Sequence, residues 1–403
     1  RSKTLEGSRA DFHSYIVEPD NVQSEDYYQS MYEIIFRANN VLKYVDNADT
    51  SNINKYTAEA KFLRAYAYFN LVRLYGAVPL LTRIATSDEK ELLFTRVAIA
   101  TVYEQIVLDL QEGVKYLNNS SKSTASKAAA QGLLAKVYLT QPTPNYSGAQ
   151  SLCEDIINSK TFALESDFSD VFYNELNDEV IFAIQYLAGN PEESQGFSSE
   201  FTSYNRQGRQ DGLNIVNPNL AQDFIDYGGN RTNASYAAFG DDVNLTVPES
   251  AEIIKFLPEG SDISDRNLPT YGGAPANAGN DWIILRYSDV LLMHAEAIMA
   301  GGDTSDSKAI DSYMEVRVRA GFDAIADRPA VLTKNALLIE RRVELAFENH
   351  RFFDLLRLGV AHDVLGAHAT AKGYTSYNIR RLLLPIPSRE INLSDGLLTQ
   401  NPQ

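Results

Sequence analysis

The feature that most constrains the fold is residues 56–75, a stretch that is apolar on two sides of a predicted helix. Phe62 and Phe69 lie on one side at helical spacing, and Leu63 and Leu71 lie on the other. A helix that is apolar on two sides needs neighbours on both. The sequence therefore predicts a helical layer with this segment packed inside it.

Gly76 and Pro79 are predicted to end this helix, because glycine adopts the left-handed conformation at helix ends and proline prevents continuation. The same apolar periodicity predicts further helices over residues 26–47, 97–117, 126–139, 146–159, 282–300, 307–320 and 333–350. Short loops make successive helices antiparallel neighbours. A strand is predicted at 179–186, and the chain after the last of these helices is predicted to be extended.

Residues 190–280 break this pattern. They hold 10 of the 23 glycines and 6 of the 14 prolines and show no sustained helical period. Disordered linkers lack aromatic residues, whereas this stretch contains many, so it is predicted to form ordered loops with short elements. Long ordered loops commonly carry function.

Composition excludes several classes of function. The chain has 36 Lys and Arg against 53 Asp and Glu, a net charge of −17, and no basic cluster, which argues against nucleic acid as a ligand. Its one cysteine, Cys153, allows neither an intrachain disulfide nor a multi-thiolate metal site. No apolar run is long enough for a membrane span. Motifs for phosphate, dinucleotide and zinc binding are absent, so no cofactor or metal is predicted.

One cluster of carboxylates invites a catalytic interpretation. Glu340, Glu344 and Glu348 recur every four residues along a predicted helix, with Arg351 and Arg357 placed to answer their charge. A glycosidase would use two such carboxylates, but nearby arginines keep carboxylates ionised. We therefore interpret the cluster as a structural ion network and predict that the chain is not an enzyme.

Two stretches of the sequence, taken together, resemble a known family. Residues 56–80 resemble the hallmark helix of SusD/RagB-type nutrient-binding lipoproteins, and residues 284–297, 316–321 and 340–359 are similar to their C-terminal signature. Residues 32–41 and 127–139 fit the family's other helices. Ala58, Phe62 and Ala65 also have the spacing of a tetratricopeptide second helix.

The resemblance implies a mainly α-helical fold in which tetratricopeptide-like helix pairs form a body at about 26–160 and 282–360. A loop-rich region with a few short strands, about 190–280, faces the ligand, and 1–403 form a single domain. The resemblance also implies a lipid-anchored protein on the extracellular face of the outer membrane in Bacteroidota. Its partner is a TonB-dependent SusC-type transporter, and the lipidated cysteine of the family is not in these 403 residues.

The expected function is non-catalytic binding of a nutrient, an oligosaccharide or a peptide. Glycan binders stack sugars on aromatic rings and satisfy hydroxyl groups with polar side chains. Candidate contacts of these types lie in the loop region, at its border and in the N-terminal segment: Asp11, Tyr27, Tyr204, Arg206, Arg209, Tyr271 and Trp282. Two alternatives stay open, a soluble tetratricopeptide-like scaffold that binds peptide or protein and a peptide-binding RagB-like variant.

Overall fold

The structure is a computed structural model that describes residues 7–202, 214, 216–238, 251–258, 261, 272, 274 and 277–402. The chain divides into two compact units. The middle unit is built on Cys153–Arg351, and the terminal unit combines Glu6–Leu152 with Phe352–Gln403. The expectation of a single domain over 1–403 stays a prediction.

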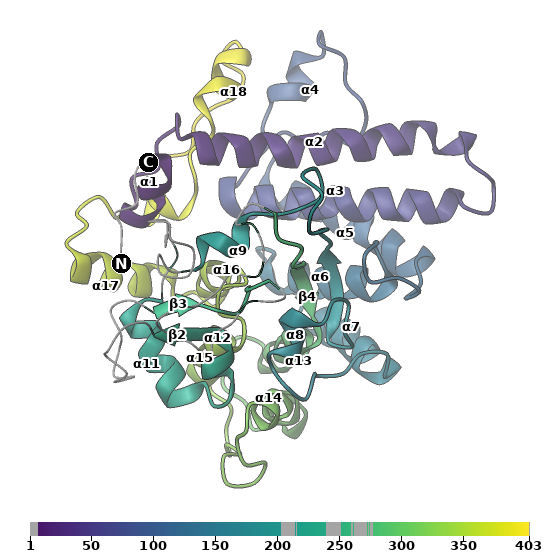
Figure 1. Ribbon diagram of the computed structural model, residues 1–403. Coiled ribbons are helices and arrows are strands. Elements are labelled where there is room, and N and C mark those ends of the chain that lie inside the picture. Colours follow the sequence, from purple (N-terminus) through teal and green to yellow (C-terminus); the bar gives the residue numbers. More distant parts are fainter. Residues whose placement is uncertain are drawn as a thin grey trace. The chain divides into compact units, whose positions relative to one another are not determined.

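The terminal unit is helical. The predicted helices at 26–47, 56–75, 97–117 and 126–139 are all present, and α2 and α3 lie side by side as a long antiparallel pair (Figure 1). Helix α5 packs on α3, and α6 packs on α5. The helices of this unit are α1 (Ser8–Ser14), α2 (Val22–Tyr44), η1 (Val45–Asn47), α3 (Ile53–Tyr75), α4 (Lys90–Phe94), α5 (Ile99–Tyr116), α6 (Lys127–Thr140), α17 (Ala361–Lys372), η2 (Ile379–Leu382) and α18 (Ser388–Leu393).

Helix α3 is the core of the terminal unit. Phe62, Phe69 and Leu71 are buried, as its two apolar sides predicted, whereas Leu63 is 42% exposed, so the second side is covered only toward the C-terminal half. Gly76 ends the helix with φ 73°, and its N–H donates to the carbonyl of residue 72. Only glycine adopts this conformation without strain.

A buried ion pair links three helices of the terminal unit. Arg64 of α3 donates to both carboxylate oxygens of Asp109 in α5, at 2.8 and 2.7 Å. Its remaining nitrogen donates to the amide oxygen of Asn39 in α2, at 2.7 Å, and to the carbonyl of Thr82. These bonds satisfy a guanidinium that is almost fully buried, and they therefore set the relative positions of the three helices.

The middle unit combines helices with two short sheets. Strand β1 (Val180–Ile184) pairs antiparallel with β4 (Trp282–Arg286), and β2 (Tyr236–Ala238) pairs with β3 (Ala251–Ile253). The predicted strand at 179–186 is thereby confirmed. The helices of this unit are α8 (Asp170–Tyr173), α9 (Phe197–Glu200), α11 (Pro218–Tyr227), α12 (Arg231–Ser235), α13 (Tyr287–Met299), α14 (Ser307–Arg319) and α15 (Lys334–Glu344). The predicted helix at 146–159, α7 (Tyr146–Ser159), and α16 (Arg351–Arg357) cross from one unit to the other.

Three predictions about secondary structure were wrong in part. The predicted helix 282–300 begins as strand β4, because its β-branched and aromatic residues pair with β1, and α13 starts only at Tyr287. The predicted helix 333–350 ends at Glu344, since Phe347 and Asn349 have positive φ angles of 70° and 61°. The chain after it is not all extended, because α16, α17 and α18 form there. Only Ala361 and Ala369 are buried in α17, too few to give a visible period.

The contact between α5 and α6 generates a prediction about packing. A Cβ atom added at Gly113 would lie 2.8 Å from the Cβ of Ala130. We expect Gly113→Ala to lower the free energy of unfolding by about 1–3 kcal/mol, although alanine is the better helix former. Denaturant unfolding measures this change. The swap G113A/A130G moves the methyl group to the other helix and should recover part of the loss; equal stability of G113A and the parent would contradict the close contact.

Candidate functional site

The residues expected to contact ligand fall into three groups. Asp11 and Tyr27 are described in the terminal unit and Trp282 in the middle unit. Four candidates lie outside the described residues: Tyr204, Arg206, Arg209 and Tyr271.

The two candidates in the terminal unit differ in their surroundings. Asp11 in α1 accepts a hydrogen bond from the side-chain amide of Asn21 at 2.8 Å, so one of its oxygens already has a structural partner. Tyr27 in α2 keeps 37% of its surface exposed. Either side chain leaves polar or aromatic surface for a ligand, and their role in binding stays a prediction.

Trp282 is the first residue of β4 and is partly buried. Its ring meets Phe197 edge-on, with centroids 5.1 Å apart at 83°, and it is tilted against Phe256 at 5.7 Å. Tyr186 and Phe201 extend this group through contacts with Phe197 and Phe256. We call these five rings the Trp282 cluster. The indole is therefore held in place by neighbouring rings while part of its surface stays open.

The residue before Trp282 carries a perturbed carboxyl group. Asp281 accepts a hydrogen bond from the backbone N–H of Tyr186 at 3.1 Å through Oδ1. Burial raises the pKa of Asp281 to about 6, and the charge of Glu175 adds to the rise. A carboxyl group beside an aromatic cluster is thus poised to change its charge near neutral pH.

A separate pocket of about 350 Å³ lies elsewhere in the middle unit. Its wall is polar and carries no aromatic ring, so it offers no stacking surface for a sugar. The lining residues are Ser166, Asp167, Ser169, Asn230, Asn233 and Ala234.

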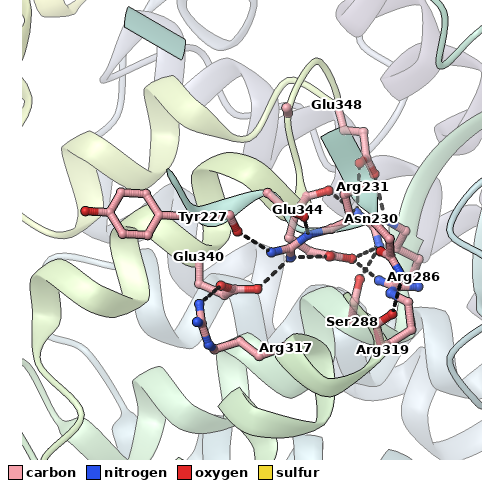
Figure 2. Close-up of polar contacts among 12 residues, drawn as sticks. Tyr227, Asn230, Arg231, Arg286, Ser288, Arg317, Arg319, Glu340, Glu344 and Glu348 are labelled. Carbon is pink, nitrogen blue, oxygen red and sulfur yellow. Dashed lines mark hydrogen bonds and ion pairs between the residues drawn. The ribbon is translucent and has the colours of Figure 1, made fainter. Parts of the chain in front are cut away.

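The carboxylates singled out in the sequence lie in a buried ion network (Figure 2). Arg286, the last residue of β4, donates to Glu179 at 2.6 Å, to Glu348 at 2.8 Å and to Glu344. Arg231, at the start of α12, donates to Glu340 at 2.6 Å and to Glu344 at 2.8 Å. Each carboxylate therefore faces a guanidinium in a site closed to solvent.

Further cations complete the network from other elements. Arg317 and Arg319 of α14 pair with Glu340 and Glu179, at 3.0 and 2.8 Å. Lys255, just after β3, donates to Glu348 at 2.7 Å. Its ammonium also lies over the rings of Phe172 and Phe168, at 4.4 and 4.9 Å from their centroids.

The expectation of an ion network agrees with this geometry, but its details were wrong. Glu348 does not continue the helical face of the other two carboxylates, because α15 ends before it. The cations expected to answer them have other partners: Arg351 donates to the carbonyl of Leu338, and Arg357 pairs with Asp354. The actual partners come from segments far away in sequence.

The cations of the network lower the pKa values of its carboxyl groups. Burial would raise the pKa of Glu344, but Arg319, Arg286 and Arg231 outweigh burial and hold it well below the usual value. Burial likewise opposes ionisation of Glu348, and Arg286 with Lys255 lowers its pKa. A glycosidase acid needs a carboxyl that keeps its proton in an open cleft, so this network does not suit glycoside hydrolysis.

Sequence reasoning missed the network cations. Lys255 and Arg286 each interrupt a run of apolar residues, whereas Arg231, which is fully buried, stands among polar residues and glycines in the sequence. A lone charge inside an apolar run was the available signal for the first two, since such a residue is buried only with a partner. Arg231 offered no such signal.

Among the described residues, no group of three or more histidine, cysteine or acidic side chains is placed to hold a metal ion. No helix in the same residues combines the length and apolar character needed to cross a membrane.

Comparison with known proteins identifies the family. A model described as "SusD family" matches residues 260–403, and one described as "Starch-binding associating with outer membrane" matches residues 2–139. Together these matches cover most of the chain and include both stretches singled out above. The chain belongs to the SusD family. Proteins of this family are non-catalytic binding proteins, which confirms the prediction that the chain is not an enzyme.

Individual relatives agree with this SusD family assignment. The chain is similar to "SusD-like protein P2" of Formosa agariphila, with 28% identity over 98% of this chain and 84% of the relative. Among solved structures it is similar to a "Laminarin binding SusD-like protein", with 26% identity, a TM-score of 0.80, and coverage of 98% and 88% of the two chains. A SusD homolog from Bacteroides thetaiotaomicron has a TM-score of 0.82 at 23% identity over 99% and 90%, which confirms the mainly helical fold with few short strands.

Arg286 provides a test of the network. We expect Arg286→Met to lower the free energy of unfolding by about 3–5 kcal/mol, because it leaves buried carboxylates without their main cation. Denaturant unfolding measures this loss. Arg286→Lys keeps the positive charge but not the planar guanidinium, so its free energy of unfolding should fall by less than that of Arg286→Met. If Arg286→Met were as stable as the parent, the network would make no net contribution to the free energy of unfolding.

The lowered pKa values of Glu344 and Glu348 predict an acid limit to stability. Their folded pKa values lie below the unfolded value of about 4.5, so the unfolded state binds more protons at low pH. The stabilisation is complete above about pH 5 and is lost progressively as the pH falls through the folded values. Melting temperatures between pH 3 and 7 measure this dependence. If the melting temperature of Glu348→Gln fell with decreasing pH as steeply as that of the parent, Glu348 would not contribute to the acid limit of stability.

Proposed function

We propose that this SusD family protein binds an oligosaccharide at the cell surface without catalysis and passes it to a TonB-dependent SusC-type transporter. One observation supports the glycan most strongly. The similarity to the laminarin binding SusD-like protein extends over nearly the whole of both chains, with a TM-score of 0.80. A structure with xylogluco-oligosaccharide is similar in fold, at 21% identity and a TM-score of 0.78 over 96% of this chain and 89% of that one.

The Trp282 cluster supplies the chemistry that a glycan needs. Sugar rings present C–H faces that pack on aromatic rings, while their hydroxyl groups require polar partners. Trp282 is partly open, and Phe197 and Phe256 fix its orientation. A ring already held in one orientation loses little conformational freedom on binding, so it favours affinity.

The location at the cell surface is inferred from the family. One of the matching models is described as associating with the outer membrane. The N-terminal lipid anchor, the extracellular face and the SusC-type transporter are proposed from the resemblance of the sequence. The other candidate contacts also stay proposals: Asp11, Tyr27, Tyr204, Arg206, Arg209 and Tyr271.

Trp282 is the only tryptophan of the chain, so its fluorescence reports on this position alone. We expect titration with a laminarin oligosaccharide to change the emission and to reduce quenching by acrylamide, because a stacked sugar shields the ring. Trp282→Ala should weaken binding about tenfold or more, in line with the free energy of stacking on an aromatic ring. Calorimetric titration measures the affinity of the variant.

Two controls separate binding from folding. Trp282→Phe keeps an aromatic ring against Phe197, so it should preserve the melting temperature better than alanine does. Tyr227→Ala removes an aromatic side chain that is 37% exposed on α11, outside the Trp282 cluster, and should leave affinity unchanged. Glycan binding with unchanged Trp282 emission would contradict this site, and binding of peptides alone would favour the RagB-like alternative.

A further inference from the structure

The polar pocket of the middle unit contains side chains whose hydrogen-bonding capacity the fold leaves unused. Its volume is about 350 Å³, and two segments of the chain line it, within 166–169 and 230–234. Five of its six lining residues carry hydroxyl, amide or carboxylate groups. A volume of this size is at the small end of the range for ligand sites, so the pocket suits a ligand no larger than one or two sugar rings.

The first wall of the pocket is held in place by Phe168, which stands between two lining residues, Asp167 and Ser169. Its ring is buried, and the guanidinium of Arg319 lies 4.9 Å from the ring centroid. Asp167 accepts the backbone N–H of Ser169 through Oδ1, at 2.8 Å. Its Oδ2 has no hydrogen-bond partner among the described residues, so this wall presents a charged acceptor.

The second wall is fixed to the end of α14. Asn230 donates through Nδ2 to the carbonyl of Arg319 at 2.9 Å, and its backbone N–H donates to the carbonyl of Ala320 at 3.0 Å. Gly229 has a φ angle of 58°, and a Cβ atom there would collide with the carbonyl of Ala320, so only glycine allows this close approach. The next residue, Arg231, belongs to the buried ion network (Figure 2).

Arg319 therefore connects the two walls. Its guanidinium packs on Phe168 in the first wall, and its carbonyl accepts the amide of Asn230 in the second. Arg319 is itself held by Glu179 at 2.8 Å and by Glu344. The walls are thus positioned before any ligand arrives, so little conformational freedom is lost on binding.

The free polar atoms of the pocket are both donors and acceptors. Because Nδ2 of Asn230 is held, its free atom is the acceptor Oδ1. The side chains of Ser166, Ser169 and Asn233 form no hydrogen bond among the described residues. A hydroxyl group donates and accepts, and an amide carries a group of each kind. The hydroxyl groups of a sugar have this same mixed character.

Other classes of ligand fit the pocket less well. Asp167 is the only charged lining residue, and its carboxylate repels an anion. A calcium ion takes six to eight oxygen ligands, commonly several carboxylates, whereas this wall offers one. The only apolar lining side chain is that of Ala234, so an apolar ligand would find little to pack on. An uncharged, hydroxyl-rich molecule remains.

We propose that this pocket binds a neutral monosaccharide by hydrogen bonds alone and is a second sugar site, separate from the Trp282 cluster. This goes beyond the proposed function, because it involves other residues and does not require stacking on an aromatic ring. Without stacking, the dissociation constant should be on the order of 1 mM, as for a small ligand of ordinary efficiency.

Titration with glucose, followed by calorimetry and by saturation-transfer NMR, tests the site. We expect saturable binding by the parent and about fivefold weaker binding by Asn233→Ala, which loses hydrogen bonds to the sugar. Ala234→Leu keeps every polar group and fills the pocket, so it should abolish binding. Asn158→Ala is the matched control: Asn158 is an exposed asparagine of α7 outside the pocket, and its loss should leave affinity unchanged.

The melting temperature shows whether these variants remain folded. Asn233 is exposed and makes no side-chain hydrogen bond among the described residues, so Asn233→Ala should melt as the parent does. Glucose binding by Ala234→Leu as tight as that of the parent would overturn the proposal. Absence of saturable binding by the parent well above the expected dissociation constant would overturn it as well.

Glucuronate tests the selection for a neutral sugar. It differs from glucose by a carboxylate, so the parent should bind it about tenfold more weakly because of Asp167. Asp167→Asn keeps the Oδ1 that accepts the N–H of Ser169 and removes the charge, so it should reduce this difference between the two sugars. A merely structural role of Asp167 would change both affinities equally. Equal binding of both sugars by the parent, or displacement of glucose by calcium, would overturn the assignment of a neutral ligand.

The emission of Trp282 distinguishes this inference from the proposed function. If glucose binding changes the emission and survives Ala234→Leu, glucose binds at the stacking site and the second site is wrong. If a laminarin oligosaccharide leaves the emission unchanged while Ala234→Leu abolishes glucose binding, the stacking site fails and the second site stands.

Discussion

The middle unit depends on the hydrogen bonds of Arg286. Its buried guanidinium meets Glu179, which precedes β1, and Glu344 and Glu348, which lie far away in sequence at the end of α15 and in the turn after it. A charge in this environment is tolerated only when every partner is present and ionised, so the network accepts one arrangement of these segments and rejects others. A single side chain thereby links the β1–β4 sheet to α15.

This constraint reaches the proposed ligand site through one strand. Arg286 ends β4 and pairs in register with Val180, whereas Trp282 begins the same strand and pairs with Ile184. The network thus fixes one end of β4, and the aromatic cluster forms at the other. A short strand held at its buried end is a rigid support, which suits a site that stacks a sugar on one ring.

The sequence predicted the parts of the fold that depend on local periodicity. Helices α3, α5 and α6 follow from apolar residues at helical spacing, and Gly76 marks a helix end by its backbone freedom. Strand β4 was assigned to a helix, because a short run of apolar residues fits a buried strand and a helix equally well. The partners of Glu344 were missed for a different reason: Arg231 and Arg286 meet it only after folding.

The same distinction applies to the site. Trp282 could be singled out as a candidate because a lone tryptophan at the border of a loop region is conspicuous, yet its packing against Phe197 was not visible in the sequence. Phe197 and Phe256 reach the indole from other segments of the chain, so the packing that orients this ring arises only on folding.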